Sequence, residues 1–347
     1  MYKVGILGAT GTVGQRMISL LDNHPWFTVT ALAASENSAG KTYAEACAWQ
    51  LDTPMPSWAA KMTVVKCEPG LACDLVLSGL DNAVAGEIED AFASAGYAVV
   101  SNAKNHRMED DVPLVIPEVN PEHLAVINRQ RKNRGWAKGF IVTNPNCSTV
   151  GLVCALKPLA DAFGLRKVAV TTMQAISGAG YPGVPSLDIL DNVIPYIGGE
   201  EEKIQTETQK LLGIFDGERF APSSTVVSAQ CNRVQVRDGH LECVSVELEK
   251  PATRERIISV WRSFVPTAAA LHLPSLPVPF ISYHEEDNRP QPRRDREAGR
   301  GMTIGIGRLR ECPVLGWKFV VLSHNTIRGA AGAAIADAEL LAAKGVL

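Results

Sequence analysis

One cysteine of the chain stands in a setting that is typical of a catalytic thiol. Cys147 belongs to the run Asn-Pro-Asn-Cys-Ser-Thr at 144–149, and an apolar run of helical character at 150–156 follows it. Because Asn146 is a favourable N-cap residue, Cys147 is expected in the first turn of a helix. The helix dipole would lower the pKa of the thiol there, and backbone N–H groups would be available to an oxyanion. These features predict that Cys147 is a nucleophile.

A nucleophilic thiol needs a partner for proton transfer, and His240 is a candidate. It ends the turn Arg-Asp-Gly-His at 237–240, after an expected strand. Spacing alone does not connect His240 with Cys147, because the two are far apart in the sequence, and a histidine in a turn is often a surface residue. Arg233 precedes this turn and suits a bidentate contact with a substrate carboxylate, with a surface salt bridge as the alternative.

Three glycines follow the first apolar run of the chain. Gly8, Gly11 and Gly14 stand directly after an expected strand at 2–7 and open an expected helix. Glycines allow a tight turn and the close approach of a pyrophosphate, and the helix start offers unpaired N–H groups. The spacing departs from Gly-x-Gly-x-x-Gly, so a turn without a ligand is the alternative. We predict a dinucleotide site.

The end of the next expected strand, at 28–33, bears on the choice between NAD and NADP. Ser35 is the first polar residue after that strand, where an acidic residue would favour NAD, so a cofactor with a 2′-phosphate is favoured. Glu36 leaves the choice ambiguous, and Lys41 supplies a positive charge nearby. A polar loop without a ligand is the alternative reading of each of these residues.

The two halves of the chain show different patterns of secondary structure. In the first half a helix at 84–95 lies among strands expected at 2–7, 28–33, 62–65, 75–78, 98–101 and 114–116. This alternation predicts a parallel, doubly wound sheet. In the second half longer strands are expected at 168–174, 225–236, 241–248 and 319–322, followed by a helix over 325–347. They predict an antiparallel or mixed sheet with helices on one face, and residues 285–300 are expected to form a loop.

Composition sets limits on the class of protein. A chain of 347 residues with 46% hydrophobic and 20% charged residues suits a globular protein of about two domains. The net charge of -3 indicates neither nucleic acid nor a membrane as partner, and we expect no signal peptide or membrane anchor. The eight cysteines include no Cys-x-x-Cys pair, so we expect no disulfide framework and no metal site. A reducing cytoplasm fits this cysteine usage.

Taken in order, these motifs resemble the aspartate-β-semialdehyde dehydrogenase family, in its archaeal and fungal branch. The resemblance spans nearly the whole chain, in matching runs at 8–16, 101–103, 107–108, 112–120, 144–149, 174–181, 200–203, 233–240 and 324–332. It implies a Rossmann-type dinucleotide-binding domain, formed by 1–146 with 325–347, and an α+β catalytic and dimerisation domain with a mixed sheet, formed by 147–324.

The resemblance also implies roles for individual residues. Cys147 resembles the nucleophile, His240 the general acid/base and Gln174 the residue that orients the substrate. Arg233 and Glu200 resemble the anchors of the substrate carboxylate and amino group. The implied phosphate-binding set is Arg107, Asn146 and Lys203. The implied cofactor contacts are Gly8, Thr10, Gly11, Thr12, Val13, Gly14, Ser35, Ser38, Ser177, Gly178 and Asn325.

One position departs from the family pattern. Relatives often carry arginine in the run Ser-x-Arg-Ser-Ala-Gly-Lys, where it can meet the 2′-phosphate, whereas this chain has Asn37. Lys41 or Arg16 would then be the cationic partner, and NADP is still expected.

The implied activity is the NADPH-dependent reductive dephosphorylation of L-aspartyl-4-phosphate to L-aspartate-4-semialdehyde through a Cys147 thioester. It serves the biosynthesis of lysine, threonine, methionine and diaminopimelate, and a cytoplasmic homodimer or homotetramer is expected. Malonyl-CoA reductase is the alternative within the enzyme class, because it uses the same thioester chemistry. A nucleotide-binding regulator with a dead site is the alternative outside it, and the presence of both Cys147 and His240 argues against that reading.

Overall fold

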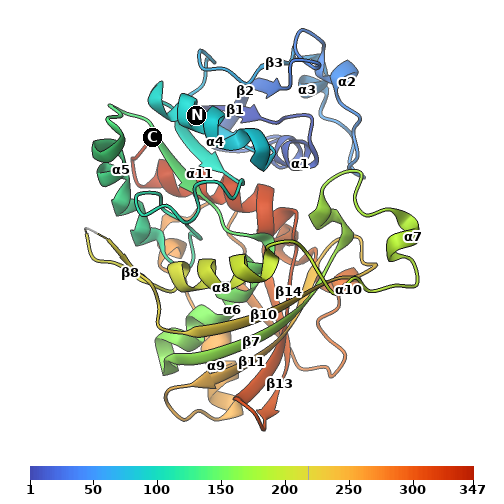
Figure 1. Cartoon of the computed structure of the whole chain (residues 1–347), viewed down its shortest axis with the longest axis vertical. Coiled ribbons are helices and arrows are strands. Elements are labelled where there is room, and N and C mark those ends of the chain that lie inside the picture. The colour runs from blue at the N-terminus through green and yellow to red at the C-terminus, as the bar shows by residue number, and fades with distance from the viewer. Residues whose placement is uncertain (218) are drawn as a thin grey trace.

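The computed structural model describes residues 1–217 and 219–347, and two six-stranded sheets organise them (Figure 1). The first sheet occupies the upper part of Figure 1, and the second lies below it, with helix α8 (Glu200–Leu211) against an edge strand of the second sheet. Helix α6 (Cys147–Phe163) follows the last strand of the first sheet and packs against strands of the second. The candidate nucleophile therefore lies where the chain passes from one sheet to the other.

The first sheet is parallel throughout, in the order β3-β2-β1-β4-β5-β6. Its strands are β1 (Tyr2–Leu7), β2 (Phe27–Ala34), β3 (Val65–Lys66), β4 (Leu75–Ser78), β5 (Ala98–Ser101) and β6 (Phe140–Thr143). Strands β4, β5 and β6 are buried at every position, as expected of parallel strands with both faces covered. The helices of this half are α1 (Thr12–Leu20), α2 (Tyr43–Ala46), α3 (Ser57–Lys61), α4 (Asn82–Ser94), η1 (Pro121–Val126) and α5 (Ile127–Arg134). This strand order confirms the predicted Rossmann-type sheet.

The strand predicted at 62–65 is wrong in its boundaries. Strand β3 begins only at Val65. The Val64 N–H donates to the Lys41 carbonyl, and the Gly40 N–H donates to the Val64 carbonyl, both at 2.9 Å. The loop after β2 therefore takes the hydrogen-bonding groups of Val64, and pairing with β2 starts one residue later.

The strand predicted at 114–116 is also wrong, because its backbone is bonded locally. Leu114 forms only an isolated bridge with Thr143. The Asn120 side chain accepts from the Ile116 N–H at 2.9 Å and donates to the Leu114 carbonyl at 2.8 Å. These bonds take the groups that a longer ladder would need. The sixth strand is instead β6, an apolar and β-branched run that was not predicted.

The second sheet is mixed, in the order β10-β7-β11-β14-β13-β12, which confirms the predicted type of sheet. Its strands are β7 (Leu165–Gln174), β10 (Val226–Arg233), β11 (His240–Leu248), β12 (Ile281–His284), β13 (Ile304–Cys312) and β14 (Gly316–Ser323). Strand β7 is parallel to β10 and antiparallel to β11. The edge strand β12 and its neighbour β13 were not predicted, and Gly305 and Gly307 weaken the strand pattern of β13.

One face of the second sheet is covered by helices and the other is open in the single chain. Helices α6 and α8 pack on strands of this sheet, and α9 (Arg254–Ser263) packs on α6 and β12. Along β10 the buried residues Val227, Ala229, Cys231 and Arg233 alternate with the exposed residues Val226, Ser228 and Gln230. The helices therefore lie on one face, as predicted.

The remaining elements are short. They are β8 (Ile214–Phe215), β9 (Phe220–Ala221), α7 (Ser186–Ile189), α10 (Pro292–Asp295), η2 (Ile176–Ala179), η3 (Thr267–Leu271) and η4 (Ala298–Gly301). The predicted loop at 285–300 is therefore interrupted by single turns of helix. In the part of the chain that the structure describes, no helix has the length and apolar character that a membrane span requires.

The last segment of the chain returns to the first sheet. The helix predicted over 325–347 consists of a π-helical turn, η5 (Ile327–Ala331), and helix α11 (Gly332–Ala343). Ile335 and Leu341 of α11 belong to the same buried apolar cluster as Ile6 of β1. The π-helical turn packs against both α1 and α6. It therefore connects the helix of the glycine-rich turn with the helix of the candidate nucleophile.

A buried ion pair fixes this connection. The Arg328 guanidinium on η5 donates to both carboxylate oxygens of Glu118, at 2.6 and 2.9 Å, and each side chain is 1% exposed. Arg328 also donates to Cys154 Sγ on α6 at 3.1 Å. One side chain thus ties the loop before η1, the π-helical turn and helix α6 together.

Removing one partner of the Glu118–Arg328 pair should strongly lower the stability of the fold. In Glu118→Leu the Arg328 charge stays buried without its partner, so we expect the free energy of unfolding to fall by about 3–5 kcal/mol. The double variant Glu118→Leu/Arg328→Met should recover most of that loss, because neither charge remains. Urea unfolding followed by circular dichroism measures both. Glu36→Gln is the control, since Glu36 pairs with Lys66 at an exposed site, and no measurable change is expected. A loss in Glu118→Leu no larger than the control would contradict this account.

Candidate active site

Helix α6 presents Cys147 at its first residue. The Asn146 side chain caps the helix, because its Oδ1 accepts from the Ser148 N–H at 2.9 Å and from the Thr149 N–H at 3.3 Å. The predicted N-cap is thus confirmed. Gly329 of η5 lies against the nucleophile, since a Cβ atom built on it would approach Cys147 Cβ to 2.7 Å. Position 329 of the π-helical turn therefore has room for a glycine only, because any side chain there would collide with Cys147.

The structure brings His240 to Cys147. His240 is the first residue of β11 and is fully buried, and its Nε2 lies 3.2 Å from Cys147 Sγ. Its Nδ1 accepts a hydrogen bond from the Ala175 backbone N–H at 3.0 Å. A backbone amide can only donate, so Nδ1 carries no proton in the neutral ring. The proton of neutral His240 is therefore on Nε2, directed at the sulfur.

The protonation state of the pair differs from the sequence prediction. Burial raises the pKa of Cys147 to about 12, and Glu200 adds to this rise, although Arg107, Arg233 and Lys203 oppose it. Burial likewise lowers the pKa of His240 to about 3, with a further contribution from Arg233. The predicted lowering of the thiol pKa by the helix dipole is thus wrong for this state, because desolvation outweighs it. Without substrate the site holds a neutral thiol and a neutral imidazole.

Glu200 connects three further residues of the site. Its Oε2 accepts from Asn146 Nδ2 at 2.8 Å and from Gln174 Nε2 at 3.2 Å. Its Oε1 accepts from Lys203 Nζ at 2.6 Å. Burial alone would raise the pKa of Glu200, but Lys203 and the two amide donors lower it below its ordinary value. Glu200 is therefore a carboxylate at neutral pH and suits a cationic group such as an ammonium.

Arg233 is buried next to the catalytic pair. Its Nη1 donates to the Ala175 carbonyl at 2.7 Å, and a Cβ atom on Gly178 would lie 2.9 Å from that nitrogen. Arg233 is 6% exposed and forms no ion pair with any residue that the structure describes. The alternative of a surface salt bridge therefore does not apply. A buried guanidinium without a carboxylate partner suits an anionic ligand.

Arg107 reaches the site from the loop after β5. Its Nη1 donates to Glu207 Oε1 at 2.9 Å, and its Nη2 donates to the Asn102 carbonyl at 2.7 Å. Glu207 Oε2 in turn accepts from the Asn146 N–H at 2.6 Å. Glu207 was not predicted, although it follows Glu200 and Lys203 at helical spacing, which was the available signal. The predicted substrate and catalytic residues thus form one connected cluster.

The glycine-rich turn fits a dinucleotide. Gly8 has a φ of +73°, and a Cβ atom on Gly14 would approach the Gly8 carbonyl to 2.4 Å, so the fold itself requires both glycines. A Cβ atom on Gly11 would meet only the Gly8 carbonyl, at an ordinary 3.4 Å. Gly11 therefore leaves space that a ligand can use. No side chain caps α1, so its first N–H groups are available to a phosphate.

The rest of the predicted turn surrounds this helix start. Thr10, Thr12 and Val13 are half-buried, and the Thr10 carbonyl accepts from Gln15 Nε2 at 2.9 Å. Gln15 also accepts from the Gln50 N–H at 2.7 Å. The buried Gln15 amide was not predicted, and these two hydrogen bonds join the glycine-rich turn to the segment around Gln50.

The loop after β2 holds the predicted 2′-phosphate residues. The Ser38 N–H donates to the Ser35 carbonyl at 2.9 Å, and the Lys41 N–H donates to the Ser38 carbonyl at 3.4 Å, so the three residues share one turn. Asn37 is exposed on the same turn. Arg16 forms no ion pair among the described residues, and its buried Nε has no hydrogen-bond partner. Burial lowers the pKa of Arg16, while the charges of Asp238 and Glu297 of the second half oppose that shift.

The last predicted cofactor contacts lie beside His240. Asn325 Nδ2 donates to Ser177 Oγ at 2.8 Å, and Asn325 Oδ1 accepts from the Gly239 N–H at 2.8 Å. A Cβ atom on Gly178 would come within 3.1 Å of the His240 ring. Ser177, Gly178 and Asn325 therefore form the side of the site next to the imidazole.

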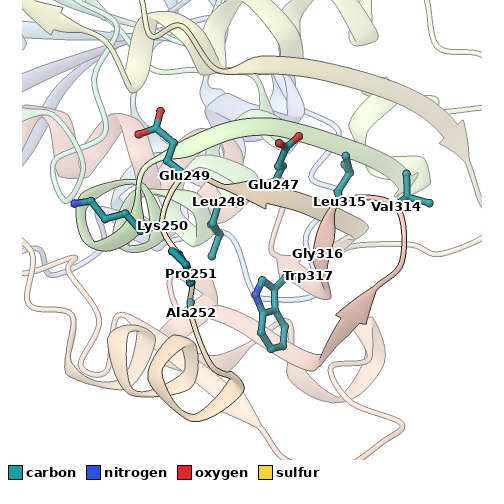
Figure 2. Close-up of a pocket in the computed structure, with 10 residues that line it drawn as sticks. All are labelled: Glu247, Leu248, Glu249, Lys250, Pro251, Ala252, Val314, Leu315, Gly316 and Trp317. Carbon is teal, nitrogen blue, oxygen red and sulfur yellow. The ribbon is translucent and has the colours of Figure 1, made fainter.

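The molecule also has a surface hollow that does not belong to this site. A surface hollow lined by residues 247–252 and 314–317 lies at the far end of β11 from His240 (Figure 2). It contains neither a cysteine nor a histidine. Among the described residues, no group of His, Cys, Asp and Glu side chains is arranged to hold a metal ion.

Comparison with known proteins identifies the family of both halves. Residues 3–127 match the family described as semialdehyde dehydrogenase, NAD binding domain, and residues 156–328 match semialdehyde dehydrogenase, dimerisation domain. The aspartate-semialdehyde dehydrogenase of Archaeoglobus fulgidus is 53% identical over 341 residues, covering 98% of each chain. That of Schizosaccharomyces pombe is 50% identical over 353 residues, covering 99% of each chain.

Solved structures agree with these relatives. Aspartate semialdehyde dehydrogenase with NADP from Candida albicans aligns with a TM-score of 0.92 at 49% identity, over 100% of both chains. Aspartate semialdehyde dehydrogenase II of Vibrio cholerae, complexed with ASA, aligns with a TM-score of 0.77 at 30% identity, over 99% of this chain and 98% of that chain. Identity at this level along the full length shows that the chain belongs to the aspartate-semialdehyde dehydrogenase family.

Proposed function

We propose that this protein catalyses the NADPH-dependent reductive dephosphorylation of L-aspartyl-4-phosphate to L-aspartate-4-semialdehyde. The observation that carries the proposal is the 3.2 Å contact between Cys147 Sγ and His240 Nε2 at the start of α6. Full-length relatives at about 50% identity that bear the name of this activity support it. The product class would supply the biosynthesis of lysine, threonine, methionine and diaminopimelate.

Four charged side chains would recognise the three charged groups of aspartyl phosphate. The Arg233 guanidinium, which has no carboxylate partner among the described residues, would bind the α-carboxylate, and the ionised Glu200 would bind the α-ammonium group. Arg107, Lys203 and Asn146 would bind the phosphate. Gln174 donates to Glu200 and accepts from Thr172 Oγ1 at 3.0 Å, so its amide is fixed between these two residues and would orient the substrate. The acyl carbon would thereby be held near Cys147 Sγ.

Proton positions determine how the acyl group is transferred. In the thiol form of Cys147, formation of the carbon–sulfur bond releases one proton, and cleavage of the carbon–oxygen bond releases phosphate, so the proton can leave on the phosphate. Arg107 and Lys203 stabilise the negative charge of that leaving group. His240 cannot accept the thiol proton at Nε2 in its neutral form, because Ala175 already fixes a proton there. Its Nε2–H instead donates to the negative sulfur that develops as the bond forms.

Reduction of the Cys147 thioester uses the same donor. NADPH, when bound at the glycine-rich turn, supplies the hydride. The Nε2–H of His240 then stabilises the oxyanion that forms on the former carbonyl, and afterwards the thiolate that is released with the aldehyde. The thiolate then takes up one proton from solvent, which restores the thiol that left its proton on phosphate, because burial favours the neutral form.

The proposed cofactor is NADP rather than NAD. The solved relative from Candida albicans is described with NADP. In this chain Ser35 takes the place of an acidic residue, and Ser38 and Lys41 share its turn. Of the two cations that the sequence offered, Lys41 stands in the same loop as Ser35 and Ser38, so we assign Lys41 to the 2′-phosphate.

We also propose the assembly and location of the protein. Residues 1–146 with 325–347 would form the cofactor domain and 147–324 the catalytic domain, supported by the packing of α11 on the first sheet. The open face of the second sheet, with exposed Val226 on β10, would be covered in a homodimer or homotetramer. A cytoplasmic location would keep the nucleophile Cys147 reduced.

A reductive assay tests the proposed activity. Purified protein should oxidise NADPH with aspartyl phosphate and not with malonyl-CoA. Cys147→Ala should lose this activity while retaining NADPH binding, as measured by fluorescence titration, because the thiol carries the acyl group and the glycine-rich turn is unchanged. Oxidation of NADPH with malonyl-CoA but not with aspartyl phosphate would reject the proposed substrate. An active Cys147→Ala variant would remove Cys147 from the mechanism.

The rate of Cys147 alkylation tests the protonation state. Because burial raises the thiol pKa to about 12, the thiolate fraction of the free enzyme should grow about tenfold for each pH unit between about pH 7 and about pH 10. Iodoacetamide labelling of Cys147, read by mass spectrometry, measures this rate, and Cys147→Ala gives the background from other thiols. A rate that levels off below about pH 7 would show a preformed thiolate and contradict the assignment.

A further inference from the structure

Helix α8 carries charged residues along one face that extends beyond the predicted substrate contacts. Glu200, Lys203, Glu207 and Lys210 are spaced by three, four and three residues, so they lie on the same side of the helix. Glu200 and Lys203 have assigned roles in the proposed function. Glu207 is 2% exposed and Lys210 is 6% exposed. Neither of these two residues has a role in the proposed function.

Glu207 connects two parts of the site that are far apart in the sequence. Its Oε1 accepts from Arg107 Nη1 at 2.9 Å, and its Oε2 accepts from the Asn146 N–H at 2.6 Å. Asn146 caps the helix that begins with Cys147. A single carboxylate therefore holds the guanidinium proposed for phosphate and the start of the nucleophile helix.

The contacts of Arg107 leave one edge of the guanidinium for a ligand. Nη1 is bonded to Glu207 and Nη2 to the Asn102 carbonyl. The buried Nε has no hydrogen-bond partner among the described residues. Because an unpaired buried donor is costly, this N–H suits an oxyanion that arrives with the substrate.

Lys210 fixes the loop on which Arg107 stands. Its Nζ donates to the carbonyls of Arg107, Glu109 and Val112, each at 2.8 Å. All three protons of the ammonium group are thus used by one loop. Together, Lys210 holds the Arg107 backbone and Glu207 holds its side chain.

We infer that Glu207 is a positioning residue for phosphate, which acts through Arg107 and couples the phosphate site to the nucleophile helix. This inference rests on the proposed function. A carboxylate beside a phosphate site also repels the anion, so its presence has to be explained. Both of its oxygens are committed to N–H donors, and they restrict a long side chain that would otherwise sample many rotamers.

The test compares substrate dependences in the oxidative direction, with aspartate semialdehyde, NADP and inorganic phosphate. Glu207→Gln should raise KM for phosphate by about tenfold or more, and leave kcat and the KM for NADP within about twofold. The matched control is Glu202→Gln, the same substitution on the exposed side of α8, which should change none of these values. An unchanged or lower KM for phosphate in Glu207→Gln would overturn the inference, and so would an equal rise for all three substrates.

A second comparison tests whether Glu207 acts through Arg107. Arg107→Lys alone and the double variant Arg107→Lys/Glu207→Gln should show the same KM for phosphate, because the residue being positioned is already replaced. Additive effects would overturn the coupling. Should Glu207→Gln fail to fold, as judged by circular dichroism, Glu207→Asp tests the same contacts with the charge retained, and its KM for phosphate should also rise.

Direct binding of inorganic phosphate, followed by 31P NMR, separates this inference from the proposed function. A wild-type protein that binds phosphate without turning over aspartate semialdehyde would contradict the proposed function. The positioning role would still be judged by whether Glu207→Gln weakens phosphate binding and Glu202→Gln does not. Equal binding by the wild type and Glu207→Gln would overturn it.

Discussion

The contact between Cys147 and His240 depends on three backbone positions drawn from both sheets. Cys147 starts α6 after the last strand of the first sheet, and His240 starts β11 in the second. Ala175, directly after β7, supplies the N–H that fixes the imidazole. Because β7 and β11 are hydrogen-bonded neighbours, the ring and its N–H donor move together. The thiol is held against them by the π-helical turn, which is anchored through Arg328 and Glu118.

Burial shapes the chemistry of this site as strongly as its charges do. It makes the neutral thiol and the neutral imidazole the stable forms, with pKa values of about 12 for Cys147 and about 3 for His240. Two of the ionised groups around them are paired, Glu200 with Lys203 and Glu207 with Arg107, whereas Arg233, among the described residues, donates only to the Ala175 carbonyl. Charge is thus available for a charged substrate, while the reacting atoms stay desolvated until the substrate arrives.

Local features of this site could be predicted from the sequence, and features that depend on distant contacts could not. The cap at Asn146 and the glycine-rich turn are set by neighbouring residues, and the structure has both. The strand expected at 114–116 failed because a side chain further along, Asn120, takes its backbone groups. The meeting of Cys147 with His240 required the family resemblance, since 93 residues separate them. Glu207 went unnoticed because its partners come from two other segments, and the thiol pKa was misjudged because burial cannot be read from local sequence.

The tautomer of His240 is the point on which the account depends most. NMR of protein labelled with 15N in its histidines reports which ring nitrogen carries the proton, and a His240→Asn variant assigns the signal. We expect a neutral ring near neutral pH, with the proton on Nε2 and an unprotonated Nδ1 that accepts the Ala175 N–H. A proton on Nδ1, or a doubly protonated ring paired with a Cys147 thiolate, would contradict the account.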